Sequence, residues 1–301
     1  MRNLIEALRP SQWIKNLSLF AAAILNGQIL NPEILTKSII AFIVFCALSS
    51  SSYLINDLVD IAKDRLHPFK KERPIARGDV SKTQAFVVSI ILLIFGLFCS
   101  LLVNNGFFSI CLFFIIFQYS YSFFLKKKAI IDIIGIALFF IIRTYAGEVA
   151  SGYHLPIWIM LTVIFLALFI ASGKRRSELM NTGKTTRSSL EGYSKALLNF
   201  YTTMFGVCTL ICYALFTFFA ETVSFDGKFH QYFLANYPKL LDRKLYMLTL
   251  FPIIFGLMRY GQIIFEMQEG ERPERVVSTD IPLMFSIIGW GILMITFVYV
   301  L

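Results

Sequence analysis

Charged residues are scarce in this sequence. Asp, Glu, Lys and Arg supply only 16% of its 301 residues, whereas hydrophobic residues supply 57%, and the mean hydropathy is +0.69. Soluble domains contain about 45 to 50% apolar residues. The composition therefore excludes an ordinary soluble protein and indicates an integral membrane protein.

Cysteine and histidine are also few, with five and three residues respectively. No CxxC or Cys/His spacing typical of a zinc site is present, and the scattered histidines form no metal-binding triad. All five cysteines fall in apolar runs, so we expect them to behave as small buried apolar residues.

Long polar regions are missing as well, so no soluble domain interrupts the apolar runs. A spanning helix needs about 20 mostly apolar residues. The chain is therefore predicted to be an all-α integral membrane protein, one domain over residues 1–301, whose nine transmembrane helices centre on residues 15–31, 38–55, 85–103, 107–125, 130–147, 156–173, 196–220, 245–265 and 281–301.

The distribution of Lys and Arg predicts the orientation, because cytoplasmic loops collect positive charge. With the N-terminus inside, 22 of the 28 basic residues fall on the cytoplasmic side and 5 on the outer side, and Arg143 lies within the fifth predicted helix. We therefore expect a cytoplasmic N-terminus and an outer C-terminus. The net charge of +9 then suits anionic headgroups and phosphate-bearing ligands rather than nucleic acid.

An acidic motif, "NDLVDIAKD", follows the second apolar run. If the helix continues, Asp57, Asp60 and Asp64 share one face, with Asn56 beside them. Carboxylates this close repel one another, and a set of oxygen ligands favours Mg²⁺. We interpret the three aspartates as catalytic metal ligands. The alternative is a solvated helix end whose acids pair with nearby lysines and arginines.

Basic residues follow directly in "RLHPFKKERPIARG". Arginine grips phosphate through parallel hydrogen bonds, so we assign Arg65, Lys70 and Arg73 to the phosphates of a metal-bound diphosphate.

Two further charged clusters stand at predicted cytoplasmic helix ends. In "GKRRSEL", Lys174 and Arg175 lie one helical turn from Glu178, and the cluster is basic in character. In "YSYSFFLKKKAIID", Tyr121 and Lys126 accompany Asp132, which stands inside a membrane helix where carboxylates are costly. The other interpretation of the lysines is simple membrane anchoring.

One cation is predicted within the membrane. Arg143 needs a partner or a water-filled cavity at that depth. Both Glu148 and a phosphate-bearing substrate fit this requirement, so structural pairing and substrate contact stay open.

The motif "NDLVDIAKD" resembles the NDxxDxxxD motif of the UbiA superfamily of intramembrane prenyltransferases. The blocks "RPSQWIKN", "DRLHPFKKERPIARG", "RTYAGEVASG" and "GKRRSEL" resemble the branch that transfers phosphoribose to decaprenyl phosphate. The resemblance implies a UbiA-type helical bundle, phosphoribosyl diphosphate (PRPP) as donor, a polyprenyl phosphate as acceptor and pyrophosphate as by-product. The site is expected on the cytoplasmic face of a bacterial inner membrane, and a homo-oligomer is compatible with the sequence.

The chain departs from ordinary prenyl-transferring relatives, which carry a second Asp-rich motif where "GKRRSE" stands. A basic motif suits two phosphate-bearing substrates and one Mg²⁺, so Lys15, Tyr121, Lys126, Lys174 and Arg175 are further candidates for phosphate binding. Two roles are open for Glu178: it either holds the basic pair in place or binds ribose hydroxyls. Two rival functions remain: prenyl transfer from a prenyl diphosphate to an aromatic acceptor, and a lipid-phosphate carrier or flippase.

Overall fold

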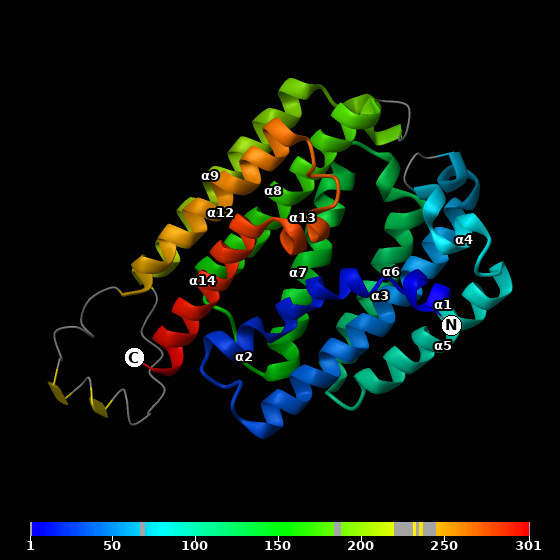
Figure 1. The fold of residues 1–301 in the computed structure, drawn as a ribbon. Coiled ribbons are helices and arrows are strands. Elements are labelled where there is room, and N and C mark those ends of the chain that lie inside the picture. Colours follow the sequence, from blue (N-terminus) through cyan, green and yellow to red (C-terminus); the bar gives the residue numbers. More distant parts are fainter. Residues whose placement is uncertain are drawn as a thin grey trace.

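Helices form almost all of the ordered structure in the computed structural model, which describes residues 2–66, 70–183, 188–219, 231–232, 235–236 and 245–300 (Figure 1). Eight helices within these residues are long and apolar enough to cross a membrane. They are α3 (Pro32–Leu66), α5 (Lys82–Ser100), α6 (Asn105–Phe123), α7 (Ile131–Ser151), α8 (Ile157–Thr182), α9 (Lys195–Phe219), α12 (Leu250–Gln262) with the turns at its two ends, and α14 (Ile281–Tyr299).

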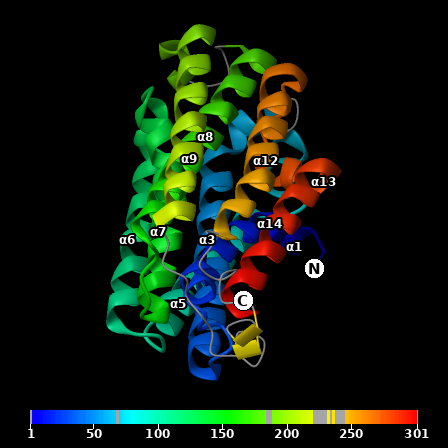
Figure 2. The ribbon, with the colours of Figure 1, turned by 90° about the vertical axis from the view of Figure 1, so that its left-hand side faces the viewer.

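Short elements join and cap these helices at both ends of the bundle. Figures 1 and 2 show α9 and α12 side by side along one flank. The short elements are α1 (Arg2–Ala7), η1 (Pro10–Phe20), α2 (Ala21–Leu25), η2 (Lys70–Glu72), α4 (Pro74–Arg77), η3 (Leu125–Lys127), η4 (Ser188–Gly192), η5 (Leu245–Thr249), the π-helical turn η6 (Ile263–Met267) and α13 (Pro273–Thr279).

The structure of the first predicted span, residues 15–31, differs from the prediction of one spanning helix. Residues 15–31 do not form one continuous α-helix, because the 3₁₀ helix η1 precedes the short helix α2. The backbone of η1 packs so closely on α7 that a Cβ at Gly147 would lie 2.3 Å from the Leu19 carbonyl oxygen. The predicted count of nine helices is therefore not confirmed, although eight of the predicted runs coincide with long helices.

This first segment nevertheless runs along the bundle from one end to the other. Arg9, just before η1, contacts Asp57 near the end of α3, whereas Asn26, just after α2, donates a 2.9 Å hydrogen bond to the His154 carbonyl between α7 and α8. The orientation of the bundle relative to the membrane stays a prediction. The predicted outer loop, residues 221–244, lies largely outside the described residues.

The longest helix, α3, carries the acidic motif in its last turns, as the sequence requires for the aspartates to share a face. Its buried serines pack against α5, where the Ser51 hydroxyl donates to the Ser89 carbonyl at 2.9 Å. Small residues let membrane helices approach closely. This packing fixes the end of α3 and hence the position of the motif.

Apolar side chains fill the interior and also cover the outside. Phe45 packs on Phe107 and Phe114 with ring centroids 5.9 and 5.0 Å apart, while Ile94 and Phe98 on α5 are 63% and 67% exposed. Exposed apolar residues on long helices are those that lipid covers in a spanning bundle. The polar residues collect instead at one end, around a cavity.

Candidate active site

A cavity of about 630 Å³ opens among the ends of α3 and α8, the segments η1 and η3, and α13. Its lining includes most of the residues predicted from the sequence. These are Lys15, Asn56, Asp57, Asp60, Asp64, Lys70, Arg73, Tyr121, Lys126, Arg143, Lys174, Arg175 and Glu178.

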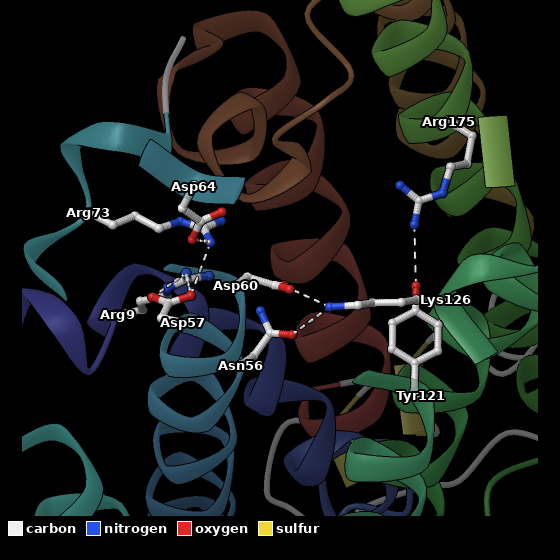
Figure 3. A network of polar contacts seen from close by, with 9 residues as sticks. All are labelled: Arg9, Asn56, Asp57, Asp60, Asp64, Arg73, Tyr121, Lys126 and Arg175. Carbon is white, nitrogen blue, oxygen red and sulfur yellow. Dashed lines mark hydrogen bonds and ion pairs between the residues drawn. The ribbon is translucent and has the colours of Figure 1, made fainter. Parts of the chain in front are cut away.

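The acidic wall of the cavity is the last part of α3 (Figure 3). Arg9 donates from Nη2 to both oxygens of Asp57 at 2.5 and 2.7 Å. Arg73 bridges two acids of the motif, because its Nη1 lies 3.0 Å from Asp57 and 2.6 Å from Asp64. Both aspartates are buried, so the arginines compensate charges that have lost most of their water.

The third aspartate pairs with a base on the opposite side of the cavity. Lys126 in η3 donates to Asp60 at 2.7 Å and to the Asn56 amide oxygen at 3.2 Å. Figure 3 shows Asn56 and Asp60 converging on this ammonium group from α3. The acids are thus paired as the alternative interpretation expected, but two of their three partners, Arg9 and Lys126, come from distant parts of the chain.

The motif presents oxygen atoms of the kind that Mg²⁺ prefers. Three carboxylates and an amide oxygen from one helix face the same cavity, and Mg²⁺ takes oxygen ligands from carboxylates and substrate phosphates. Among the described residues, no three His, Cys, Asp or Glu side chains converge closely enough to ligate one ion. The residues fit a cation chemically if Arg9, Arg73 and Lys126 move from the carboxylates to incoming phosphates.

The basic wall of the cavity is α8, where Arg175 is enclosed by acids. Its Nε lies 2.6 Å from Asp132, its Nη1 pairs with Glu178, and its Nη2 donates to the Tyr121 hydroxyl at 3.3 Å. The Arg175 side chain is 1% exposed.

Asp132 does not line the cavity but stands behind Arg175. It accepts hydrogen bonds from Ser189 at 2.9 Å and from the Tyr193 hydroxyl at 2.6 Å. Burial and the neighbouring carboxylate raise the pKa of Tyr193 above its usual value, so this phenol stays a hydrogen-bond donor. Asp132 is therefore a residue that holds Arg175 rather than one that touches a ligand.

Two other predicted residues have contacts that define their roles. Arg65 does not line the cavity, because its Nε donates to the Ala76 carbonyl at 3.0 Å and so fastens α4 to α3. Arg143 lines the cavity and donates to Asn16 at 2.8 Å and to Ser49 at 3.3 Å.

Glu148, the alternative partner of Arg143, is engaged elsewhere. It accepts from the Leu155 amide at 3.0 Å and lies 3.4 Å from the His154 ring. Instead, Arg143 lies over the Phe114 ring, with its guanidinium carbon 5.0 Å from the centroid. The partners of this buried cation among the described residues are thus uncharged, and they tie η1, α3 and α6 to α7.

Sequence reasoning missed several charged residues of the cavity. Arg9 reaches Asp57 from the N-terminal segment, and α13 adds Glu274 beside Lys15. Arg9 stands in a sequence block already noted, "RPSQWIKN", but no spacing rule connects residues so far apart. The other charged residues that the prediction missed are Glu6, Glu72, Glu271, Arg272 and Arg275.

The described residues form a helical membrane protein with a charged cavity at one end of its bundle. The chain belongs to the UbiA prenyltransferase family, whose model matches residues 17–225.

Two named relatives match almost the whole chain. It is 35% identical to a decaprenyl-phosphate phosphoribosyltransferase of Mycolicibacterium smegmatis, over 95% of this chain and 89% of the relative. It is 32% identical to the protein of that name in Corynebacterium glutamicum, over 99% of this chain and 87% of the relative.

Solved structures share the fold at lower sequence identity. A UbiA homologue of Archaeoglobus fulgidus bound to GPP and Mg²⁺ superposes with a TM-score of 0.71 at 22% identity, over 97% of this chain and 96% of that one. A UbiA homologue from Aeropyrum pernix superposes with a TM-score of 0.65 at 14% identity, over 93% of this chain and 98% of that one.

Proposed function

We propose that the protein transfers 5-phosphoribose from PRPP to a polyprenyl phosphate and releases pyrophosphate. The observation that carries the proposal is the similarity, over nearly the full chain, to relatives named decaprenyl-phosphate phosphoribosyltransferase. The cavity supports it independently. Its second wall holds Lys174 and Arg175, and two cations do not suit a second metal ion; because Arg175 is already paired with Asp132 and Glu178, Lys174 is the group that suits a phosphate.

In the proposed reaction, the bond between ribose C1 and the diphosphate oxygen breaks, and its electron pair leaves with pyrophosphate. An oxygen of the polyprenyl phosphate forms the new bond to C1. That oxygen is already anionic near neutral pH, so no strong base is required, and holding the two substrates in line supplies much of the rate enhancement.

Asp57, Asp60 and Asp64, with the Asn56 amide, would hold Mg²⁺, which neutralises negative charge on a leaving diphosphate. The bases that now pair with these acids are then available to the phosphates. Arg73 and Lys126 reach the motif from opposite sides, so they are positioned to bind the donor's phosphates around it. Because the bases exchange one anion for another, no unpaired charge is created.

The proposal includes a location and an orientation. We expect the cavity to face the cytoplasm from a bacterial inner membrane, as the excess of basic residues at that end predicts. Single cysteines in place of Lys71 and Lys37, in an otherwise cysteine-free protein, would then react with an impermeant reagent from opposite faces. Labelling of both from one face contradicts the orientation.

A direct assay tests the reaction. Purified protein receives labelled PRPP with polyprenyl phosphate and, separately, labelled prenyl diphosphate with 4-hydroxybenzoate. We expect label from PRPP in the lipid fraction and none in a prenylated ring. The rival prenyl transfer draws support from the family and from the GPP-bound structural neighbour, and prenylation of the ring without transfer from PRPP would establish it. The carrier hypothesis fails if covalent transfer occurs.

A further inference from the structure

Three glutamates, Glu178, Glu271 and Glu274, line the side of the cavity that also holds Lys174 and Arg175. Glu274, in α13, lines the cavity with its side chain only 13% exposed. Its Oε2 lies 3.4 Å from Nζ of Lys15, and the charge of Lys174 also acts on it. An acid in a cavity for phosphate-bearing substrates repels them, so its presence there calls for a reason.

Glu274 is held in this wall from both sides. Before α13, the Gly270 amide donates to the Ser177 hydroxyl of α8 at 3.1 Å. After α13, Asp280 caps α14 and pairs with Arg259 at 2.7 Å. The segment that carries the Glu274 carboxylate is therefore anchored to α8 on one side and to α12 on the other.

The carboxylate has unused capacity to accept hydrogen bonds. Within the described part of the chain, no group donates a hydrogen bond to Oε2, although this atom is buried. Burial opposes ionisation of Glu274, but Lys15, Lys174 and a hydrogen bond from Gln12 lower its pKa to about 2. The Lys15 ammonium compensates the charge from 3.4 Å, but Oε2 keeps acceptor positions that a hydrogen-bond donor on a ligand would fill.

The donor substrate brings a suitable group. Its phosphates are mainly hydrogen-bond acceptors near neutral pH, whereas the 2- and 3-hydroxyls of its ribose are donors. We propose that Glu274 accepts a hydrogen bond from a ribose hydroxyl and so determines specificity for a ribosyl donor. This inference rests on the proposed function and deepens it by naming the residue that recognises the sugar.

The neighbours of Glu274 suit the same ligand. Lys15 lies beside the carboxylate and the charge of Lys174 acts on it, while a ribose that carries phosphates at C1 and C5 presents its hydroxyls between two anionic groups. Of the two roles that the sequence left open for Glu178, its ion pair with Arg175 fits holding the basic pair in place. Recognition of the ribose then falls to Glu274.

The test compares Glu274→Met with wild type, because methionine keeps the length of the side chain but is a poor acceptor. Glu269→Met, an exposed glutamate on the same connection, is the matched control. Each protein is assayed with PRPP and with its 2-deoxy and 3-deoxy analogues. Comparing variant with wild type on each donor cancels the donor's intrinsic reactivity.

We expect Glu274→Met to lower kcat/KM for PRPP about tenfold to a hundredfold and to affect at least one deoxy analogue much less. The KM for polyprenyl phosphate and all values for Glu269→Met should stay near wild type. A merely structural role would instead lower kcat/KM equally for all three donors, and that result overturns the inference.

Two further measurements distinguish failure of this inference from failure of the proposed function and from unfolding of the variant. If wild-type protein neither binds nor uses PRPP, the proposed function itself fails. If Glu274→Met unfolds in detergent, Glu274→Gln replaces it. Because its amide is a weaker acceptor, a smaller loss of the same selectivity is expected, and unchanged selectivity contradicts the inference.

Discussion

On α3, the aspartates face the cavity and pair with bases that arrive from other elements, whereas on α8 Arg175 lines the cavity but is enclosed by acids and almost fully buried. Arg9 and Arg73 keep side-chain exposures of 22% and 24%. Arg175 and its partner Asp132 are exposed by 1% and 0%. The two walls carry similar charges but differ in their access to water and ligand.

This difference separates exchangeable ion pairs from permanent ones. A base that reaches into a hydrated cavity exchanges its carboxylate for a substrate phosphate at little cost, because water and ligand compensate both charges. A buried pair cannot separate without leaving an uncompensated charge. We therefore infer that the α3 wall rearranges when substrates bind, while Arg175 stays in place and shapes the basic wall.

The largest expected effect is on activity at the α3 wall. Asp57→Ala and Asp60→Ala should each lower the rate of phosphoribosyl transfer about a hundredfold to a thousandfold. A loss of this size is typical when electrostatic stabilisation of a transition state is removed. Both proteins should remain folded, because Arg9, Arg73 and Lys126 are left facing a hydrated cavity. Activity at several Mg²⁺ concentrations and thermal unfolding in detergent measure the two effects.

The control for this experiment is Asp79→Ala. Asp79 is exposed, pairs with Arg77 and lies outside the cavity lining, so its removal should leave transfer near wild type. Near-normal, Mg²⁺-dependent activity of either motif variant would contradict the assignment of the motif.

The sequence predicted the acids of the α3 wall better than the bases that pair with them. The spacing of Asp57, Asp60 and Asp64 sufficed because a continuous helix fixes which residues share a face. The identity of Arg9 as a partner depends on how η1 packs along α7, which no local pattern encodes. Glu274 and Lys15 meet for the same reason, through tertiary packing of segments from opposite ends of the chain.

Prediction of the fold from the sequence is limited by tertiary packing in the same way. Hydropathy located the long helices because each needs about 20 apolar residues. It did not reveal that residues 15–31 divide into the 3₁₀ helix η1 and the short helix α2, or that Leu19 packs closely on Gly147 of α7. Helix packing, unlike helix position, is a property of pairs of segments.

The second prediction concerns stability at the α8 wall. Arg175→Ala leaves Asp132 and Glu178 as buried acids without their cation, and breaking a buried pair in this way costs about 3 to 5 kcal/mol. We expect a lower unfolding temperature in detergent than for Asp57→Ala. Adding Asp132→Asn and Glu178→Gln to Arg175→Met should recover part of the loss. If Arg175→Ala is as stable as wild type and raises only KM, the pair is exchangeable after all.

A smaller effect is expected for the bases of the α3 wall. Lys126→Met should raise the KM for PRPP by about tenfold, equivalent to about 1.4 kcal/mol, because one charge-assisted contact to phosphate is lost. Stability should change little. Lys128→Met, an exposed lysine two residues further on, is the matched control. An unchanged KM in Lys126→Met would mean that this lysine stays with Asp60 when substrate binds.

The smallest effect is expected behind the α8 wall, at the edge of the Arg175 network. Ser189 donates one 2.9 Å hydrogen bond to Asp132, which keeps its contacts with Tyr193 and Arg175 when that donor is removed. Ser189→Ala should therefore cost about 1 kcal/mol of unfolding free energy and leave the KM of both substrates unchanged. Ser109→Ala, whose exposed hydroxyl bonds within its own helix, should cost less than about 0.5 kcal/mol. A change in KM without a change in stability for Ser189→Ala would show that the buried network moves during binding, and the contrast between a rearranging α3 wall and a fixed α8 wall would then be wrong.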